Sequence, residues 1–408
     1  MNAIVQKWPE EGFTRIPLWV YTDPEIFEKE MELFFFGKTW NYICLSCEIP
    51  NKGDYIRSWV GTRPVVATRD ANGEIHVLEN RCVHKNALVC WKPRGNEKAL
   101  ICPYHQWTYK LDGQLSGVPF RKGALGKGGM PSDFEPKQHG MRRLKVHERN
   151  GVVWASFAED AEDFEAYCGP DVLGYVDRLF PGRPLKLLGY QRQSIPCNWK
   201  MYFENLKDPY HATLLHTFYI TFGLWRADSQ AMSGCDGGGK HGMMFSRNDS
   251  GKKTSEATSE MTRFADSLVI NDKDTVSPMF EFEDRKAAGI TLFPSVVLQQ
   301  QANSLAMRHL IPKAPGMMEL SWTFFGYEDE PEELTRLRKR HANLVGPAGF
   351  VSIDDSEVLS QCQIAAEGAD DGRAMVEMGG RDVETQDHMI TEVQIRGFYK
   401  WYREAMGL

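Results

Sequence analysis

Apolar and polar positions change their spacing three times along the chain. Residues 24–36 have the spacing of an amphipathic helix, which Asp23 and Pro24 would begin. From residue 40 to residue 157 the apolar runs are short and alternate with polar residues, as in a small antiparallel β domain. Beyond residue 184, long strand-like runs mix with helical segments without a regular strand–helix–strand repeat. The pattern beyond residue 184 predicts an α+β domain with a large antiparallel sheet.

Turn signals refine this pattern. Asn72-Gly73, Asp112-Gly113 and Asn150-Gly151 each separate two apolar runs and predict three β-hairpins. Residues 158–183 are predicted to form a helical, acidic connector. Farther along, strands are predicted at 186–193, 289–301, 304–312 and 318–327, helices at 331–345 and 384–405, and a mobile loop at 228–260.

Composition narrows the class of protein. The chain has 408 residues, which predicts more than one domain, and the pattern places the limits at 1–39, 40–157 and 158–408. Its net charge is −7 without long runs of like charge, so nucleic acid and membranes are not expected as partners. No apolar run is long enough for a membrane helix, and the first residues lack a signal-peptide pattern. Nine scattered cysteines suit a reducing compartment, so we expect a cytoplasmic protein.

Two short motifs in the β region each combine one cysteine with one histidine. They are Cys82-Val83-His84 and Cys102-Pro103-Tyr104-His105, and each lies beside a predicted hairpin. Thiolates and imidazoles together suit a structural zinc ion or an iron–sulfur cluster, and the ligand types alone do not decide between them. Cys44 and Cys47 have no second pair nearby and are predicted to be buried strand cysteines rather than ligands.

Asp208, His211 and His216 form a second candidate group. Asp208 also fits the N-cap of a helix, which favours a purely structural interpretation. On a regular helix the two histidines would diverge by about 140°, so sharing a metal requires a distorted or π-type turn. Two histidines and one carboxylate form a known type of Fe(II) site, and Asp354 or Asp355 could supply the carboxylate. A helix capping box is the structural alternative for Asp355.

The segment from Asn205 to His216 and the segment with Asp354 and Asp355 together resemble the large (α) subunit of Rieske non-haem iron aromatic-ring-hydroxylating oxygenases. The motif of that family in the first of these segments is Asn-x-x-Asp-x-Tyr-His-x-x-x-x-His. The resemblance implies a [2Fe–2S] cluster held by Cys82, His84, Cys102 and His105. It implies an Fe(II) held by His211, His216 and Asp355. Asp208 would have a bridging role between the two centres, and Asn205 would lie near the iron. It also implies a Rieske domain inserted into a helix-grip (START/Bet v1-like) catalytic domain. Lys85-Asn86 and Gln106 depart from the Arg-Gly and Gly that are usual in the family.

The resemblance further implies the partners and the substrate. The implied assembly is a homotrimer, commonly α3β3 with a small β subunit, in which the cluster of one subunit serves the iron of the next. NAD(P)H would supply electrons through a reductase, with or without a ferredoxin, because the chain shows no nucleotide or flavin motif. The segments 208–228 and 387–397 are most similar to the branch acting on salicylate, anthranilate and terephthalate. Its members hold an aromatic carboxylate through arginine, so Arg308 and Arg396 are the candidate anchors.

These features predict a terminal oxygenase component that hydroxylates an aromatic carboxylate with dioxygen, in the catabolism of aromatic compounds. A Rieske monooxygenase that removes O- or N-methyl groups uses the same centres and is an alternative. A Rieske electron carrier with no enzymatic activity is a third interpretation, but it has no use for the motif at residues 205–216. The sequence leaves open which aromatic acid is the substrate, and whether the product is a phenol or a cis-dihydrodiol.

Overall fold

The computed structural model describes residues 6–225, 229–236, 238–247, 268–282, 286–369 and 371–408. The chain forms two compact units. One is Phe34–Phe164, and the other combines Met1–Leu33 with Glu165–Leu408. The smaller unit therefore interrupts the larger one in sequence, as expected for an inserted domain.

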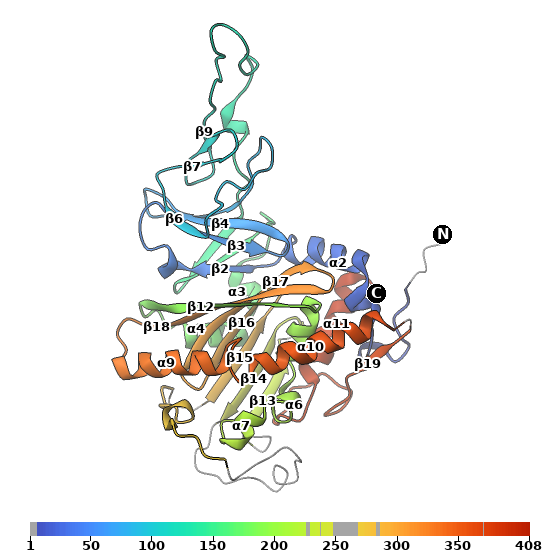
Figure 1. The fold of residues 1–408 in the computed structure, drawn as a ribbon. Helices are drawn as coiled ribbons and strands as arrows, with labels where there is room; N and C mark the ends of the chain where they lie inside the picture. Colours follow the sequence, from blue (N-terminus) through green and yellow to red (C-terminus); the bar gives the residue numbers. More distant parts are fainter. Residues whose placement is uncertain (1–5, 226–228, 237, 248–267, 283–285, 370) are drawn as a thin grey trace. The chain divides into compact units, whose positions relative to one another are not determined.

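Three antiparallel sheets make up the smaller unit (Figure 1). The first has the order β5-β4-β3-β6, with β3 at Asp54–Val60, β4 at Arg63–Arg69, β5 at Ile75–Glu79 and β6 at Arg94–Asn96. The second has the order β10-β11-β2, with β2 at Asn41–Leu45, β10 at Lys145–Arg149 and β11 at Val152–Ser156. The third joins the short strands β7 (Leu100–Ile101), β8 (Thr108–Tyr109) and β9 (Leu115–Gly117).

The three predicted hairpins are confirmed as the pairs β4–β5, β8–β9 and β10–β11. Gly73, Gly113 and Gly151 have φ angles of 91°, 87° and 87°, which a side chain would disfavour. The prediction for the cysteine pair is half right. Cys44 is buried in β2, but Cys47 is only partly buried and lies in the 3-10 turn Ser46–Glu48.

Aromatic side chains define the limits of the smaller unit. Phe36 contacts Phe157 edge to face at 5.5 Å between ring centroids. Phe164 packs against Trp40 at 6.0 Å. Because these contacts lie outside or at the ends of residues 40–157, the compact unit extends a few residues beyond that range on both sides.

A seven-stranded antiparallel sheet is the centre of the larger unit (Figure 1). Its strands follow the order β12-β18-β17-β16-β15-β14-β13. Their bounds are β12 Leu185–Ile195, β13 Ala231–Cys235, β14 Gly242–Arg247, β15 Lys286–Leu292, β16 Val296–Gln301, β17 Ser304–Ala314 and β18 Met317–Tyr327. A separate pair joins β1 (Arg15–Pro17) to β19 (Arg373–Met375).

Helices surround this sheet. They are α1 (Trp19–Thr22), α2 (Pro24–Glu30), α3 (Phe164–Cys168), α4 (Pro170–Leu179), α5 (Trp199–Asn205), α6 (Pro209–Ala212), α7 (Thr217–Thr221), α9 (Glu332–Val345), α10 (Ser352–Glu367) and α11 (Val393–Met406), with 3-10 turns at Gly12–Thr14 and Lys273–Thr275. The 3-10 turn at Pro136–Gln138 belongs to the smaller unit, and a π-helical turn at Met31–Phe35 spans the sequence boundary between the two units. In Figure 1, α9 and α10 run across the sheet. No helix among the described residues combines the length and apolar character that crossing a membrane requires.

One strand prediction and one loop prediction were wrong. The run 289–301 was predicted as one strand, but it forms β15 and β16, which are joined by a tight turn around Pro294. The stretch 228–260 was predicted as a mobile loop, but β13 and β14 occupy 231–247 and pair with each other. Small residues give these two strands a weak sequence signal, and pairing with β15 stabilises them. Residues 228, 237 and 248–260 lie outside the described residues.

Two helix predictions also need correction. The last helix begins at Val393 rather than near residue 384, because Gln386 instead pairs with Ser233 through two main-chain hydrogen bonds of 2.8 and 2.9 Å. The capping box at the start of α10 does not form. Ser352 is the first helical residue and Val351 occupies the N-cap position without a side-chain bond, so Asp355 is left for another role.

Candidate metal centres

Two loops of the smaller unit carry the first group of ligands. Cys82 and His84 follow β5, and Cys102 and His105 lie between β7 and β8. The two cysteines are 1% and 2% exposed, while His105 lies at the surface. The two imidazole rings are 4.5 Å apart between centroids, and His84 stacks on Trp107 at 4.8 Å. Thiols thus gather on the inner side of this site and imidazoles on the outer side.

The two loops have the same backbone form. The N–H of Asn86 donates to the carbonyl of Cys82, and the N–H of Gln106 donates to the carbonyl of Cys102, at 2.9 and 3.0 Å. Asn86 and Gln106 both have a φ of 58°. This left-handed conformation costs a residue other than glycine about 1–2 kcal/mol. It explains why glycine is usual at these positions, and why the departures from glycine affect the loop rather than the ligands.

The donor set fits a two-iron cluster better than a single zinc ion. Burial and the neighbouring Cys82 thiol raise the pKa of Cys102, so the two sulfurs are close together. The four ligand atoms do not, however, form one group within 4.8 Å of one another, which one tetrahedral zinc would require. Nδ1 of His84 is buried and has no hydrogen-bond partner. Paired sulfurs beside paired imidazoles suit one iron held by sulfur and one held by nitrogen.

Tyr109 is a residue of this site that the sequence analysis did not identify. Its hydroxyl lies 3.1 Å from the sulfur of Cys82 and accepts the N–H of Val83 at 3.3 Å. In the sequence Tyr109 is an ordinary hairpin residue beside Asp112-Gly113, and only the β8–β9 pairing brings it under the cluster loop.

Replacing Tyr109 with phenylalanine is expected to lower the reduction potential of the Rieske cluster. A hydrogen bond to a ligand sulfur stabilises the more negative, reduced cluster. A loss of about 1 kcal/mol corresponds to a decrease on the order of 50 mV. Redox titration followed by the electron paramagnetic resonance of the cluster measures this shift, and a value equal to that of the wild-type protein would show that the contact is neutral.

Four helices of the larger unit bring together the second group of ligands. Asn205 ends α5, Asp208 is the N-cap of α6, and His211 lies within α6. His216 is the N-cap of α7, and Asp355 lies in the first turn of α10. A turn between α6 and α7, rather than a π-type turn, brings the two histidines to the same side.

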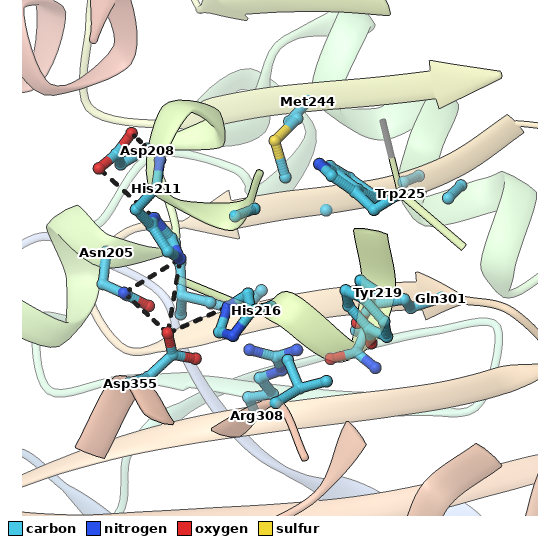
Figure 2. A pocket seen from close by; sticks show the side chains of 18 of the residues that line it. Asn205, Asp208, His211, His216, Tyr219, Trp225, Met244, Gln301, Arg308 and Asp355 are labelled. Carbon is cyan, nitrogen blue, oxygen red and sulfur yellow. Dashed lines mark hydrogen bonds and ion pairs between the residues drawn. The ribbon is translucent and has the colours of Figure 1, made fainter. Parts of the chain in front are cut away.

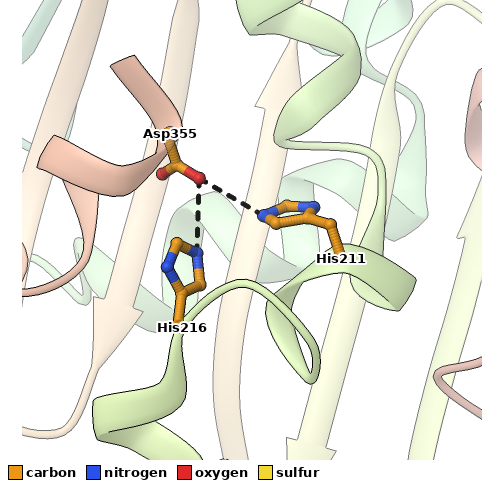
Figure 3. A group of neighbouring side chains, drawn as sticks. All are labelled: His211, His216 and Asp355. Atoms are coloured by element: carbon orange, nitrogen blue, oxygen red, sulfur yellow. Dashed lines mark ion pairs between the residues drawn. The ribbon is translucent and has the colours of Figure 1, made fainter. Parts of the chain in front are cut away.

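The side chains converge on one carboxylate oxygen (Figure 3). Nε2 of His211 and Nε2 of His216 lie 3.4 and 3.3 Å from Oδ1 of Asp355. Each of the three residues offers one ligand atom within 4.8 Å of the other two, and His216 and Asp355 are buried. Asn205 donates from Nδ2 to the same Oδ1 at 3.1 Å and lies 3.3 Å from Nε2 of His211 (Figure 2). The donor set matches the two-histidine, one-carboxylate site of non-haem iron.

Asp208 caps α6 and also faces His211. Its Oδ1 accepts the main-chain N–H of Tyr210 at 2.8 Å and that of His211 at 3.2 Å, which caps α6. Its Oδ2 lies 3.4 Å from Nδ1 of His211. The structural interpretation and the functional one are therefore compatible, because the two carboxylate oxygens serve different partners.

A buried polar network holds α5 in place. Nζ of Lys200 pairs with Glu30 at 2.7 Å, and both side chains are fully buried. Glu204 accepts hydrogen bonds from the hydroxyls of Tyr21 and Tyr399. Burial raises the pKa of Glu204 to about 7, against the opposing effect of these hydrogen bonds. Since Asn205 directly follows Glu204, the network fixes one wall of the iron site.

Carboxylates dominate the electrostatics of this centre. Burial alone would lower the pKa of His211, but Asp208 and Asp355 raise it to about 10. Burial alone would raise the pKa of Asp355, but the two histidines hold it well below its ordinary value. Without metal, Asp355 is therefore ionised and His211 carries a proton at neutral pH.

Metal uptake by the emptied iron site is expected to weaken as the pH falls. Metal binds the neutral imidazole, so it must displace the proton of His211 at any pH below about 10. One displaced proton changes the apparent affinity about tenfold per pH unit. Titration with Co(II) across neutral pH measures this slope, and Asp208→Asn should flatten it. An affinity that does not change with pH would contradict the assignment.

A pocket that is partly open to solvent adjoins the three ligands. Its lining includes Asn205, Asp208, His211, His216, Tyr219, Trp225, Met244, Ala287, Val297, Gln299, Gln301, Arg308 and Asp355 (Figure 2). Three polar groups in this wall were not predicted. The hydroxyl of Tyr219, Nε1 of Trp225 and the amide of Gln299 are buried and have no hydrogen-bond partner within the described part of the chain. Tyr219 and Trp225 stand among apolar residues, and Gln299 begins a run of three glutamines, so the direction of each side chain was not evident in the sequence.

The two candidate arginines have different surroundings. Arg308 is 6% exposed, lines the pocket and stacks on Trp322 at 4.2 Å, with only the hydroxyl of Tyr202 near its Nη1, at 3.4 Å. Its Nε has no partner, and no carboxylate of the described residues forms an ion pair with it. Arg396 does not reach the pocket. Its guanidinium donates to three main-chain carbonyls, those of Asp382, Val376 and Met378, at 2.7, 3.2 and 2.9 Å.

A loop site for a two-iron cluster together with a two-histidine, one-carboxylate site defines a Rieske non-haem iron oxygenase. Residues 39–127 match the Rieske [2Fe-2S] domain, and residues 175–408 match the ring hydroxylating alpha subunit (catalytic domain). The chain belongs to this family of ring-hydroxylating oxygenase alpha subunits. The predictions of a Rieske cluster, a mononuclear iron and an oxygenase are confirmed.

Similar proteins span the whole chain. The large oxygenase component of salicylate 5-hydroxylase from Ralstonia sp is 46% identical over 407 residues, covering 98% of this chain and 96% of that protein. The alpha 2 subunit of the terephthalate 1,2-dioxygenase terminal oxygenase from Comamonas sp is 39% identical over 413 residues, covering 100% and 99%. The anthranilate 1,2-dioxygenase large subunit from Burkholderia cepacia is 39% identical over 405 residues, covering 98% and 95%.

The fold has a close match among solved structures. Naphthalene 1,2-dioxygenase from Rhodococcus sp., solved with bound indole, superposes with a TM-score of 0.79. The match covers 96% of this chain and 94% of that one, at 24% sequence identity. The predicted fold, a Rieske domain inserted into a catalytic domain with a large antiparallel sheet, is therefore confirmed.

Proposed function

We propose that this protein hydroxylates an aromatic carboxylate, and that Arg308 binds the carboxylate group. The observation that carries the proposal is a buried guanidinium without a carboxylate partner among the described residues, in the same pocket as His211, His216 and Asp355. A buried charge left unpaired is costly, so such a site favours an anionic ligand. The relatives named for salicylate, terephthalate and anthranilate, all aromatic acids, support the same class of substrate.

The residues have distinct proposed roles. Cys82, His84, Cys102 and His105 would hold the Rieske cluster, and His211, His216 and Asp355 would hold the mononuclear iron. When bound, the cluster supplies electrons, and the iron provides the open positions at which dioxygen is activated. Asp208 orients the ring of His211 through Nδ1, and Asn205 holds Oδ1 of Asp355 by a hydrogen bond.

Arg308 has a positioning effect on the substrate. The fork of its guanidinium can hold both oxygens of a carboxylate, which fixes the orientation of the attached ring. Apolar lining residues such as Met244 and Val297 exclude water from the ring. A carboxylate anchored at Arg308 would direct the ring toward the His211 and His216 side of the pocket (Figure 2).

The proposed assembly is a homotrimer, with or without a small β subunit. This proposal is supported by the exposure of one edge of the proposed cluster site and one edge of the proposed iron site. His105 lies at the surface of the smaller unit beside Tyr104, which is 65% exposed, and the side chain of Asp208 is 19% exposed. In a ring of subunits, His105 could approach the partner subunit's Asp208. A cytoplasmic location is proposed as well, and its support is that none of the nine cysteines, all of which the structure describes, forms a disulfide.

The proposed electron donor is an acidic reductase or ferredoxin. Residues 81–130 contain nine lysines and arginines but only two acidic residues, although the whole chain has a net charge of −7. Lys85, Lys92 and Lys98 are exposed in this segment, near Trp91, which is 62% exposed. A basic surface with an exposed aromatic side chain beside the cluster fits an acidic redox partner.

Rising salt is expected to slow electron delivery. Attraction between a basic and an acidic surface is screened within about 10 Å at ~0.1 M salt. The kcat/KM for the donor should fall about tenfold or more between low and high salt. Lys92→Glu should remove much of this dependence, while Lys339→Glu on α9, also exposed, should not. Stopped-flow reduction of the cluster measures the effect, and equal behaviour of the two variants would contradict the proposal.

Two measurements test the proposed function. Iron analysis should give three irons per chain, two from the Rieske cluster and one from the His211 site, whereas an electron carrier would have two. A substrate panel with a surrogate NADH reductase should show oxygen uptake coupled to hydroxylation of salicylate or a related benzoate. Product only from uncharged rings would overturn the proposed substrate class. Only loss of methyl groups from methoxybenzoates would keep that class and overturn ring hydroxylation as the reaction.

A further inference from the structure

In each histidine of the proposed iron site, both ring nitrogens face a carboxylate, and the two carboxylates differ. The Nε2 atoms of His211 and His216 face Asp355, at 3.4 and 3.3 Å. Nδ1 of His211 faces Oδ2 of Asp208 at 3.4 Å, and Nδ1 of His216 faces Oδ2 of Asp354, also at 3.4 Å. The two outer pairs have the same distance, but only the His216–Asp354 pair has hydrogen-bond geometry among the described residues, and only Asp208 belongs to the motif at residues 205–216.

We propose that Asp354 is a positioning residue that fixes the ring and the tautomer of His216. A neutral imidazole has one N–H, and an acceptor at Nδ1 keeps the proton on that nitrogen. Nε2 then keeps its lone pair on the side of Asp355, where a metal would bind. This inference rests on the proposed function, because it assigns a role to Asp354 within the same iron site.

The position of Asp354 on α10 explains how it differs from Asp355. Consecutive residues of a helix point about 100° apart. Asp355, 4% exposed, therefore faces the space between the histidines, while Asp354, 37% exposed, reaches the outer edge of His216. A partly hydrated carboxylate can fix the ring without the cost of burying a second charge beside Asp355.

A purely structural role for Asp354, in stabilising helix α10, makes a different prediction. An acidic residue in the first turn of a helix stabilises that helix by about 0.3–1 kcal/mol through the helix dipole. If this were its whole contribution, removing it would lower thermal stability slightly and leave metal binding by a folded protein unchanged. Metal affinity and the state of the His216 ring therefore separate the two roles.

The first test measures metal affinity in the protein with its Rieske cluster in place and the mononuclear site emptied by chelation. Co(II) affinity should fall 10- to 100-fold in Asp354→Ala. It should fall less in Asp354→Asn, which keeps an acceptor oxygen and the shape of the side chain. Glu357→Gln is the matched control, since Glu357 is exposed on the same helix and bonds only to Gln361 at 3.0 Å. This control should bind Co(II) as the wild type does.

The second test observes the His216 ring itself. Co(II) should produce two shifted, exchangeable N–H signals in the NMR spectrum, one from each histidine. In Asp354→Ala one of them should exchange faster with solvent, while in Glu357→Gln both should remain. Wild-type affinity with both signals unchanged in a folded Asp354→Ala protein would overturn this inference alone. A wild-type protein that does not bind Co(II) at all would instead overturn the proposed iron site.

Discussion

Asp355→Ala is expected to leave the protein with two irons per chain and without hydroxylated product. Asp355 is the single carboxylate that faces both His211 and His216, and its Oδ1 also accepts the amide of Asn205. Two neutral imidazoles alone bind Fe(II) far more weakly, because the anionic ligand is lost. We expect turnover to fall by about 1,000-fold or more, because a chain that has lost its mononuclear iron lacks the group at which dioxygen is activated.

The Rieske cluster provides an internal control for this experiment. Cys82 and Cys102 belong to the other compact unit, so the absorbance and electron paramagnetic resonance of the cluster should remain unchanged in Asp355→Ala. Glu357→Gln, on the same helix α10, should keep three irons and full activity. Normal iron content in Asp355→Ala would show that another carboxylate, of which Asp354 is the nearest in sequence, holds the metal.

Arg308→Leu is expected to lower kcat/KM for salicylate about 100-fold and to change the turnover of an uncharged ring little. A charge-assisted pair between guanidinium and carboxylate in a buried pocket contributes on the order of 3 kcal/mol. Each 1.36 kcal/mol corresponds to about tenfold in rate. Leucine keeps the pocket apolar, so a neutral arene of similar size should still bind.

Stability distinguishes substrate binding from a structural role of Arg308. Without substrate the guanidinium has only Trp322 and Tyr202 as near partners among the described residues. Removing an unpaired buried charge should not lower the melting temperature, and substrate should stabilise the wild type but not the variant. Arg192→Leu, an exposed position on β12, is the matched control. An equal loss of turnover for charged and neutral rings would refute the carboxylate anchor.

Arg396 shows why a sequence cannot rank such candidates. Both arginines interrupt apolar stretches, so both fit a charged group facing a pocket. Arg396 instead satisfies three main-chain carbonyls of the segment 376–382, whereas Arg308 on β17 points into the cavity. Which direction a buried side chain takes depends on the elements packed around it, and these come from distant parts of the chain.

The failure to predict strands β13 and β14 has a similar explanation. β13 and β14 are rich in small and unbranched residues, lack β-branched side chains, and have Phe245 as their one aromatic side chain. Their stability comes from pairing with each other and with β15. Conversely, the hairpins at Asn72-Gly73, Asp112-Gly113 and Asn150-Gly151 were predicted correctly because a tight turn is specified by the residues within it.

The sequence by itself determined the chemistry of this protein. The cysteine and histidine motifs at 82–84 and 102–105, and the histidines at 211 and 216, are close along the chain, so covalent spacing alone makes them candidate ligands. Only the tertiary structure decided which distant groups complete each site. Residue spacing left Asp354 and Asp355 open and the family resemblance favoured Asp355, and in the structure Asp355 faces both histidines. The hydroxyl of Tyr109, which no sequence pattern indicated, reaches the sulfur of Cys82. The physical reason is that these contacts join separate elements, and their geometry is set by the packing of helices and sheets rather than by local spacing.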